Sequence, residues 1–481
     1  MKFLFQISFI LFLSACTYKQ QFNPETSLFP ERIGTLIQSK CATSGCHNEA
    51  SYQAAAGLNL SSWSALFEGS NGGMPVIPYR PKESFFLYFL HQNEDITPYI
   101  SPLMPLNGEP LSEEDVLAIY DWIEMGAPNI HGEIAFDELI TEDKIFITNQ
   151  GCDQITVLNK ADRKIIRMFD VGNDPGIESP HYLKLSPDKK TIYVCFTAGS
   201  YFQAFDTETF EKVGQTNIGF GNWNTFALKS DGSQAFVVEW ENNGRVAVVD
   251  LNTMELIQMF QGGNLLTFPH GSIISPNDQY LYLTAQTGNF VYKADVSDPQ
   301  NTDEFETISL NANPASSAPA LDIHEIIFSP DGTKYFATCQ RSNEVRVMNA
   351  ANDSLLDVID VGVYPQEMAV STTLPYLVVT CPEDTASFPG KRGSVQIINY
   401  NTFEVMANLF SGFQPHGLAI NEEEQVVYIA NRNQTSDGIA PHHTSECGGR
   451  NGYLTVIDLN TLEVDLDQIE LISDPYAVTA Q

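Results

Sequence analysis

A repeated four-strand module fills most of this chain and constrains its fold more than any other feature. From about residue 141 onward, a polar residue, an alternating apolar run and a Ser-Pro-Asp type of turn recur, as in His181-Tyr-Leu-Lys-Leu-Ser-Pro-Asp188. A second and a third short strand follow each turn, and the third usually ends in Asp-x-x-Thr, as in Asp250-Leu-Asn-Thr253. Four short strands separated by turn residues at a fixed period are typical of one β-propeller blade.

The two ends of the repeat region indicate how such a ring closes. Residues 144–171 read as second, third and fourth strands without a first, whereas Pro475-Tyr-Ala-Val-Thr-Ala480 reads as a first strand alone. One blade built from both segments would remove exposed sheet edges, and six complete repeats beside it predict seven blades over residues 141–481. This region resembles the YVTN-type, or YncE-like, propellers, which implies an all-β seven-bladed β-propeller.

The same alignment predicts a polar ring at one mouth of the central channel, because one residue opens each innermost strand. In blade order these residues are His181, Asn224, His270, His324, Gln366, His416 and Tyr476. A long loop over about 431–451 is expected on the same face and carries His442, His443 and Cys447. Converging imidazoles favour a metal, copper above all, or a large planar cofactor. The alternative is a structural ring that caps strands and binds water.

Two known propeller enzymes share parts of this pattern. Nitrous oxide reductase, which holds a copper–sulfide cluster on a seven-bladed propeller, resembles this chain in its His-Gly strand openings and its adjacent His pair. The resemblance implies metal ligands at His181, His270, His324, His416, His442 and His443. That family uses seven histidines and a copper domain whose pattern is not evident here. The cytochrome cd-type nitrite reductases resemble the chain only in placing a cytochrome before a propeller, and theirs has eight blades.

Near the amino end, Cys41-Ala-Thr-Ser-Gly-Cys46-His47 predicts covalent attachment of haem. In such motifs two thiols form thioethers with the haem vinyl groups, and the adjacent His ligates the iron. The usual spacer is two residues, whereas four separate these cysteines. A disulfide or a zinc-binding pair is the alternative. Met104, in a Met-Pro loop, is the candidate second axial ligand, with Met74 and His91 as rivals.

A capped helix follows the Met-Pro loop. Ser112 precedes three acidic residues, and the segment stops at Gly126-Ala-Pro128. Its apolar stripe consists of Val116, Ile119, Tyr120 and Ile123. With these features residues 30–130 resemble the small cytochrome c domains fused to bacterial periplasmic proteins. The resemblance implies a small all-α domain with one haem c bound covalently at Cys41 and Cys46, and His47 and Met104 as axial ligands of the iron.

The first sixteen residues predict export. Lys2, an apolar run over residues 3–13 and the ending Leu13-Ser-Ala-Cys16 match a bacterial lipoprotein signal peptide; an ordinary signal peptide cut nearby is the alternative. Lipidation of Cys16 would anchor the protein to a membrane, with residues 17–29 as a tether. Thr17, in place of an acidic residue, favours the outer membrane over the inner membrane, with either side of the outer membrane left open. The apolar run is too short to span a bilayer.

Charge and cysteine content narrow the class of partner. The formal net charge is −35, which argues against nucleic acid, because a nucleic-acid-binding protein needs a basic surface. The same charge would favour a basic redox partner protein. In an oxidising compartment, Cys152 with Cys447, or Cys339 with Cys381, are candidate disulfides. Cys195 is expected to be buried and unreactive.

These features predict a membrane-anchored periplasmic c-type cytochrome with a haem domain (30–130), a linker (131–140) and a propeller (141–481). Its expected function is haem-mediated electron transfer, with the propeller as a docking or ligand-recognition module. The alternative is an oxidoreductase whose histidine ring binds copper or another redox cofactor that exchanges electrons with the haem. A lactonase is a more distant alternative, because no calcium-binding carboxylate cluster is evident. The sequence identifies neither the redox partner nor a substrate.

Overall fold

The structure is a computed structural model. It describes residues 23–481 except for 174, 262–265, 299, 301–303, 312, 317–320, 433–446, 448–451 and 466. Cys16, the signal segment and residues 17–22 of the proposed tether therefore lie outside the described residues. No helix in the described part of the chain is long and apolar enough to cross a bilayer.

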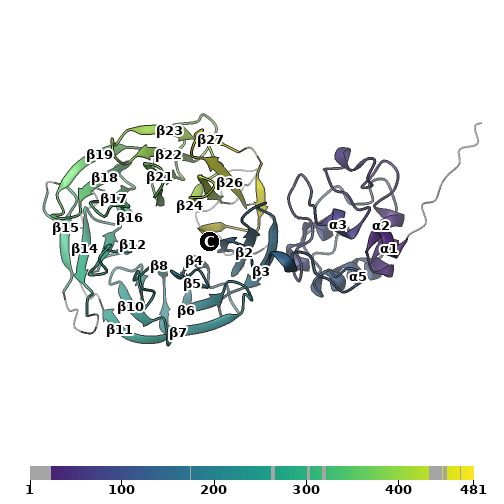
Figure 1. The fold of residues 1–481 in the computed structure, drawn as a ribbon, viewed down its shortest axis with the longest axis horizontal. Helices are drawn as coiled ribbons and strands as arrows, with labels where there is room; N and C mark the ends of the chain where they lie inside the picture. The colour runs from purple at the N-terminus through teal and green to yellow at the C-terminus, as the bar shows by residue number, and fades with distance from the viewer. Residues whose placement is uncertain are drawn as a thin grey trace, which may run out of the picture.

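Seven antiparallel sheets surround a central channel (Figure 1), and in each the innermost strand is named first. The closing sheet holds β29 (Pro475–Ala480), β1 (Lys144–Asn149), β2 (Gln154–Asn159) and β3 (Ile165–Asp170). The second sheet holds β4 (Pro180–Leu185), β5 (Thr191–Phe196), β6 (Gly199–Asp206) and β7 (Lys212–Gly221). The third holds β8 (Trp223–Leu228), β9 (Gln234–Glu239), β10 (Arg245–Asp250) and β11 (Glu255–Gln261).

The remaining four sheets continue round the ring. They hold β12 (Pro269–Ile274), β13 (Tyr280–Ala285), β14 (Phe290–Asp295) and β15 (Glu306–Ser309); β16 (Ile323–Phe328), β17 (Lys334–Cys339), β18 (Glu344–Asn349) and β19 (Leu355–Asp360); and β20 (Met368–Val370), β21 (Tyr376–Cys381), β22 (Ser394–Asn399) and β23 (Val405–Leu409). The last holds β24 (Pro415–Asn421), β25 (Val426–Asn431), β26 (Gly452–Asp458) and β27 (Glu463–Val464), with β28 (Ile469–Leu471) also paired to β26.

The predicted seven-bladed propeller is confirmed, and so is its mode of closure. The carboxy-terminal strand β29 pairs antiparallel with β1, so one blade contains both ends of the repeat region. The C-terminus accordingly lies close to the central channel (Figure 1). Second strands such as β5, β17 and β21 are buried along nearly their whole length, because each lies inside a sheet packed between neighbouring blades.

The prediction of a small all-α cytochrome c domain is wrong. Residues 23–143 contain five short helices, of which only two are longer than four residues, joined by loops and three 3₁₀ turns. The helices are α1 (Pro24–Ser27), α2 (Glu31–Lys40), α3 (Trp63–Leu66), α4 (Phe85–Tyr88) and α5 (Glu113–Glu124), and the 3₁₀ turns are η1 (Tyr52–Ala54), η2 (Pro81–Glu83) and η3 (Asp137–Leu139). Closely spaced Gly and Pro residues, as in Gly72-Gly-Met-Pro75, interrupt helical runs and keep α3 and α4 short.

The amino-terminal region is also not a separate domain, because its apolar side chains share one core with the closing blade. Phe29, Ile123 and Phe136 belong to the same buried cluster as Phe146 and Phe169 of that blade. The outer strand β3 lies next to this region (Figure 1). Hydrogen bonds also join this region to the closing blade. They run from Arg80 Nη1 to Asp170 Oδ1 (2.7 Å), from Gln154 Nε2 to Glu83 Oε1 (2.8 Å) and from Arg167 Nη1 to Ala135 O (2.8 Å).

One local prediction within this region is confirmed. Ser112 caps α5, because its Oγ accepts a hydrogen bond from the Asp115 N–H at 3.2 Å. Val116, Ile119 and Ile123 are buried as the stripe predicted, and Trp122 is buried beside them.

Candidate functional site

A β-bulge near the start of every innermost strand except β20 positions the residues at the channel mouth. In β16 the register with β17 shifts between Ile323 and Ile326, so that His324 and Glu325 together oppose one residue of β17, Thr338. A bulge of this kind turns its residues out of the regular pleat. Equivalent shifts occur at His181, His270 and His416. The predicted ring positions are therefore structurally equivalent.

The ring histidines pack against one another and against Tyr476 with tilted rings. The ring centroids of His270 and His324 lie 3.8 Å apart, and those of His416 and Tyr476 lie 3.7 Å apart. The His181 ring is tilted against that of Tyr476 at a centroid distance of 4.2 Å. Its Nδ1 lies 2.7 Å from the Asn224 carbonyl oxygen, which can only accept, so this nitrogen carries the proton. All four histidines are at least 97% buried.

The structure leaves the predicted copper site untested. No group of three or more His, Cys, Asp or Glu side chains in that part of the chain is arranged to hold a metal ion. His442 and His443 lie outside the described residues. Copper binding at His181, His270, His324 and His416 thus stays a prediction.

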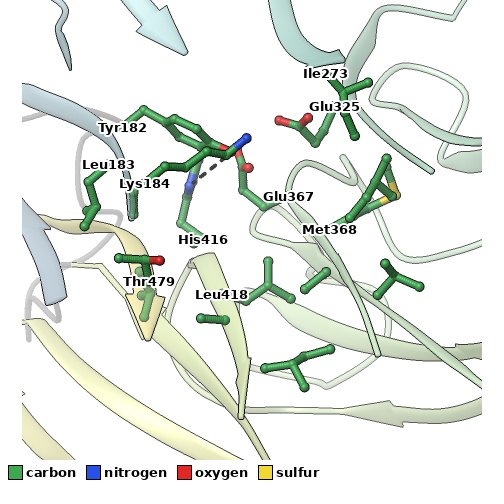
Figure 2. A pocket seen from close by; sticks show the side chains of 18 of the residues that line it. Tyr182, Leu183, Lys184, Ile273, Glu325, Glu367, Met368, His416, Leu418 and Thr479 are labelled. Carbon is green, nitrogen blue, oxygen red and sulfur yellow. Dashed lines mark ion pairs between the residues drawn. The ribbon is translucent and has the colours of Figure 1, made fainter. Parts of the chain in front are cut away.

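A charged cluster lines the channel next to the histidine ring. Lys184 on β4, Glu325 on β16 and Glu367 just before β20 border a cavity of about 310 Å³. Their side chains point toward one another across it (Figure 2). Glu325 is 6% and Glu367 8% exposed. The Glu367 Oε1 lies 3.8 Å from the Nδ1 of His324 and 4.0 Å from that of His416. Three elements far apart in sequence thus bring two carboxylates and one ammonium together.

Burial changes the acid–base properties of this cluster. It raises the pKa of Glu325 to about 7, although the Ile326 N–H and the Lys184 charge lower it. It also raises the pKa of Glu367 well above its ordinary value, and the Glu325 charge adds to this rise. Burial lowers the pKa of Lys184, whereas the two glutamates raise it. The cluster therefore favours fewer charges than three separate groups would carry in water.

Sequence reasoning missed these three residues, although a signal was present. The position after the ring residue is Gly271, Gly417 and Ala477 in three blades but glutamate in two neighbouring blades. The glycines are required by close approach: a Cβ on Gly271 would lie 2.6 Å from the His324 carbonyl oxygen, and one on Gly417 would lie 2.1 Å from that of Tyr476. The other two blades have Tyr182 and Thr225 at this position, so glutamates in two neighbouring blades, and in no other, indicated a specialised sector of the channel.

The predicted haem-attachment segment forms a closed loop. Cys41 follows α2 directly, and the His47 N–H donates to the Cys41 carbonyl at 3.2 Å. Gly45 has φ of 81°, and a Cβ at this position would meet no atom within 4 Å, so the four-residue spacer turns at this glycine toward open space. Cys41 and Cys46 are both free thiols, so the alternative disulfide between them is absent. Burial and then the nearby Cys46 raise the pKa of Cys41 to about 12.

His47 has the tautomer that an iron ligand requires. Its Nδ1 lies 3.2 Å from the Leu58 carbonyl oxygen. A carbonyl can only accept, so Nδ1 carries the proton and the Nε2 of the neutral ring keeps its lone pair. Metal-ligating histidines commonly donate their second ring N–H to such an acceptor, which fixes the ring orientation.

The three candidates for the second axial ligand differ in their surroundings. Met104 is half-buried against the shared core, and its N–H donates to the Phe89 carbonyl at 2.7 Å. His91 uses both ring nitrogens internally, with Nδ1 accepting from the Asn93 N–H at 3.0 Å and Nε2 2.8 Å from the Thr97 hydroxyl. Met74 is 3% exposed within the core. These contacts favour Met104 over both rivals.

The remaining cysteines separate into two groups. Cys152 and Cys447 form a disulfide that joins the closing blade to the loop before β26. Cys195, Cys339 and Cys381 are buried free thiols, so the second candidate pair is not bridged. Burial raises the pKa of each of these three thiols above its ordinary value, which is consistent with unreactive core residues.

Comparisons with known proteins show the fold. No protein-family model matches the sequence, and no curated protein matches it. The periplasmic gluconolactonase PpgL of Pseudomonas aeruginosa is 16% identical with a TM-score of 0.54, over 70% of this chain and 98% of that protein. A functionally unknown protein from Desulfotomaculum acetoxidans is 14% identical with a TM-score of 0.53, over 71% of this chain and 99% of its own. At such identities the likeness shows a shared propeller fold alone.

Proposed function

We propose that this protein is an exported lipoprotein that is anchored to the outer membrane through Cys16 and transfers electrons through one covalently bound haem. In this proposal its propeller recognises a small molecule or a partner protein. Cys41 and Cys46 would hold the haem, and His47 and Met104 would be the axial ligands. A haem bound there would supply one-electron redox chemistry.

The orientation of His47 carries this proposal. The residue adjacent to Cys46 presents a nitrogen lone pair on Nε2 because Nδ1 is bonded to the Leu58 carbonyl. The loop closed by His47 and Cys41 keeps both thiols and the imidazole within one short segment, beside open space at Gly45. These residues therefore fit the chemistry of haem attachment, although they belong to a region that is not an independent all-α domain.

Direct contact between this region and the propeller supports a joint role. Arg80 and Arg167 link it to the closing blade through hydrogen bonds to Asp170 and Ala135. An electron carrier fixed to a recognition module keeps its redox centre at a constant distance from whatever the module binds. The strongly acidic surface, with a net charge of −35, would attract a basic redox partner at low ionic strength.

Covalent haem is tested with protein matured in a host that attaches haem to c-type cytochromes. A denaturing gel stained for haem peroxidase activity should show a coloured band at the mass of this chain. A double variant, Cys41→Ala with Cys46→Ala, should lose that covalent band, because both thioether sites are gone, whereas the control Cys195→Ala, which removes a buried propeller thiol, should keep it. A wild-type mass equal to that of the processed polypeptide without haem would contradict the proposal.

A further inference from the structure

The central cavity has an imbalance of charge. Two buried carboxylates, Glu325 and Glu367, face one ammonium group, Lys184. Lys184 forms no ion pair within 4 Å in the described part of the chain, and its Nζ lies 5.2 Å from the centre of the Tyr182 ring. Its charge therefore acts on the carboxylates over a distance. Full ionisation of the three groups would leave one negative charge without a counter-charge.

One carboxylate oxygen in the same cavity also has no hydrogen-bond donor within reach among the described residues. Glu325 Oε1 accepts from the Ile326 N–H at 2.9 Å, but the buried Oε2 has no hydrogen-bond partner among the described residues. Glu367 has histidine nitrogens only at 3.8 and 4.0 Å, beyond ordinary hydrogen-bond length. Buried polar atoms normally have partners, so an unpaired carboxylate oxygen that lines a cavity indicates a missing donor.

A small organic cation would supply both the balancing positive charge and the hydrogen-bond donor. A protonated amine carries one positive charge and several N–H donors. A metal ion is a poorer match, since no group of three or more His, Cys, Asp or Glu side chains in the described residues is arranged to hold one. The cavity, about 310 Å³, is at the small end of ligand pockets, which span roughly 300–1,000 Å³.

We propose that the central channel binds a small organic molecule through its protonated amine, whose N–H groups donate to Glu325 and Glu367. Lys184 limits the site to a single added positive charge, and Tyr182 and His416 form its walls. This inference rests on the recognition role proposed for the propeller and names its ligand class. It does not require haem.

Calorimetric titration of the full-length protein with ethanolamine tests the proposal, with ethylene glycol as the neutral ligand of the same size. At about pH 8 ethanolamine should bind saturably and at least about tenfold more tightly than ethylene glycol, because only the amine supplies the positive charge. Glu325→Gln and Glu367→Gln should each weaken ethanolamine binding at least about tenfold. Glu255→Gln, which alters an exposed carboxylate on β11, should leave it unchanged.

Lys184→Met separates charge recognition from a general effect on folding. Removal of the competing ammonium should tighten ethanolamine binding, which is opposite in sign to the effect of the two glutamine variants. Equal affinity for the two ligands, no ethanolamine binding by the wild type, or weaker binding by Lys184→Met would each overturn the proposal. Protein made in a host that cannot attach haem should bind ethanolamine equally well, so this result and the haem test can fail independently.

Discussion

At the scale of single residues, the channel carboxylates are costly to the fold. Glu325 and Glu367 are buried beside each other with one nearby ammonium, and burial disfavours their ionised forms. A buried ionised group with an incomplete set of partners destabilises a folded protein. Carboxylates that lower the stability of the folded protein but line a cavity are expected to contribute to ligand binding.

Glu325→Gln should therefore stabilise the protein at alkaline pH. The folded-state pKa of Glu325 is raised from 4.5 to about 7, so the folded protein binds more protons than the unfolded chain between these values. Stability then falls as pH rises through this window, and the full penalty is present only above it. We expect a gain of about 1–3 kcal/mol at about pH 8 that mostly disappears near about pH 5.

Thermal unfolding at the two pH values measures this effect, with Glu255→Gln on the outer strand β11 as the control. A lower unfolding midpoint for Glu325→Gln at alkaline pH would show that the carboxylate already has a complete set of partners in the folded protein.

At the scale of elements, a threonine on a second strand joins neighbouring blades at the bulge. Thr338 on β17 accepts a hydrogen bond from the Glu325 N–H at 2.9 Å, and its hydroxyl donates to the Gln366 carbonyl of the next blade at 2.7 Å. Thr284 on β13 repeats this arrangement with Gly271 and His324 at 2.8 and 2.9 Å. At each bulge a backbone N–H and a backbone carbonyl have no partner in the strand ladder. The threonine hydroxyl bonds to both of them, to the N–H in its own blade and to the carbonyl in the next blade.

Thr338→Val should destabilise the propeller by about 2–4 kcal/mol, because it leaves a buried N–H and a buried carbonyl without their partner while keeping the side-chain shape. Chemical denaturation measures the difference. Thr307→Val, on the exposed face of the outer strand β15, is the matched control and should change stability by less than about 0.5 kcal/mol. Equal stability of both variants would show that the inter-blade bonds contribute no net stability.

At the scale of the whole molecule, closure and the shared core combine the parts into one unit. The pairing of β29 with β1 closes the ring, and the Cys152–Cys447 disulfide links the closing blade to its neighbour. The amino-terminal region packs into the same apolar cluster. Its helices are too short to be stable by themselves, since most helical stability comes from tertiary packing.

Calorimetry should therefore show one main unfolding transition that includes the amino-terminal region. Phe136→Ala, which removes a buried ring packed 5.6 Å from Phe67 within the shared core, should lower that transition by several degrees, as expected for a loss of about 3–5 kcal/mol. Leu117→Ala on the exposed face of α5 is the control and should leave the midpoint nearly unchanged. A separate low-temperature transition that alone shifts in Phe136→Ala would indicate an independent domain.

The blade number, the closing strand, the channel-mouth positions and the Ser112-capped helix α5 were all predictable from the sequence. Each depends on local patterns: strand alternation, turn residues and a repeat period that determine secondary structure and the phase of each strand. The candidate haem loop was likewise visible as a short motif, and its chemistry stays a prediction. The prediction of an all-α domain was wrong, because the helical pattern of α5 does not determine whether neighbouring segments are helical or which core they join.

Only the tertiary structure decided which distant residues meet. Lys184, Glu325 and Glu367 come from three blades, and their convergence depends on ring geometry and on bulges that turn Glu325 into the channel. The choice of Cys152–Cys447 over the other cysteine pair likewise depends on distances across blades. Local sequence determines what each strand presents on each face, whereas the distance between strands far apart in sequence is determined by how the blades pack.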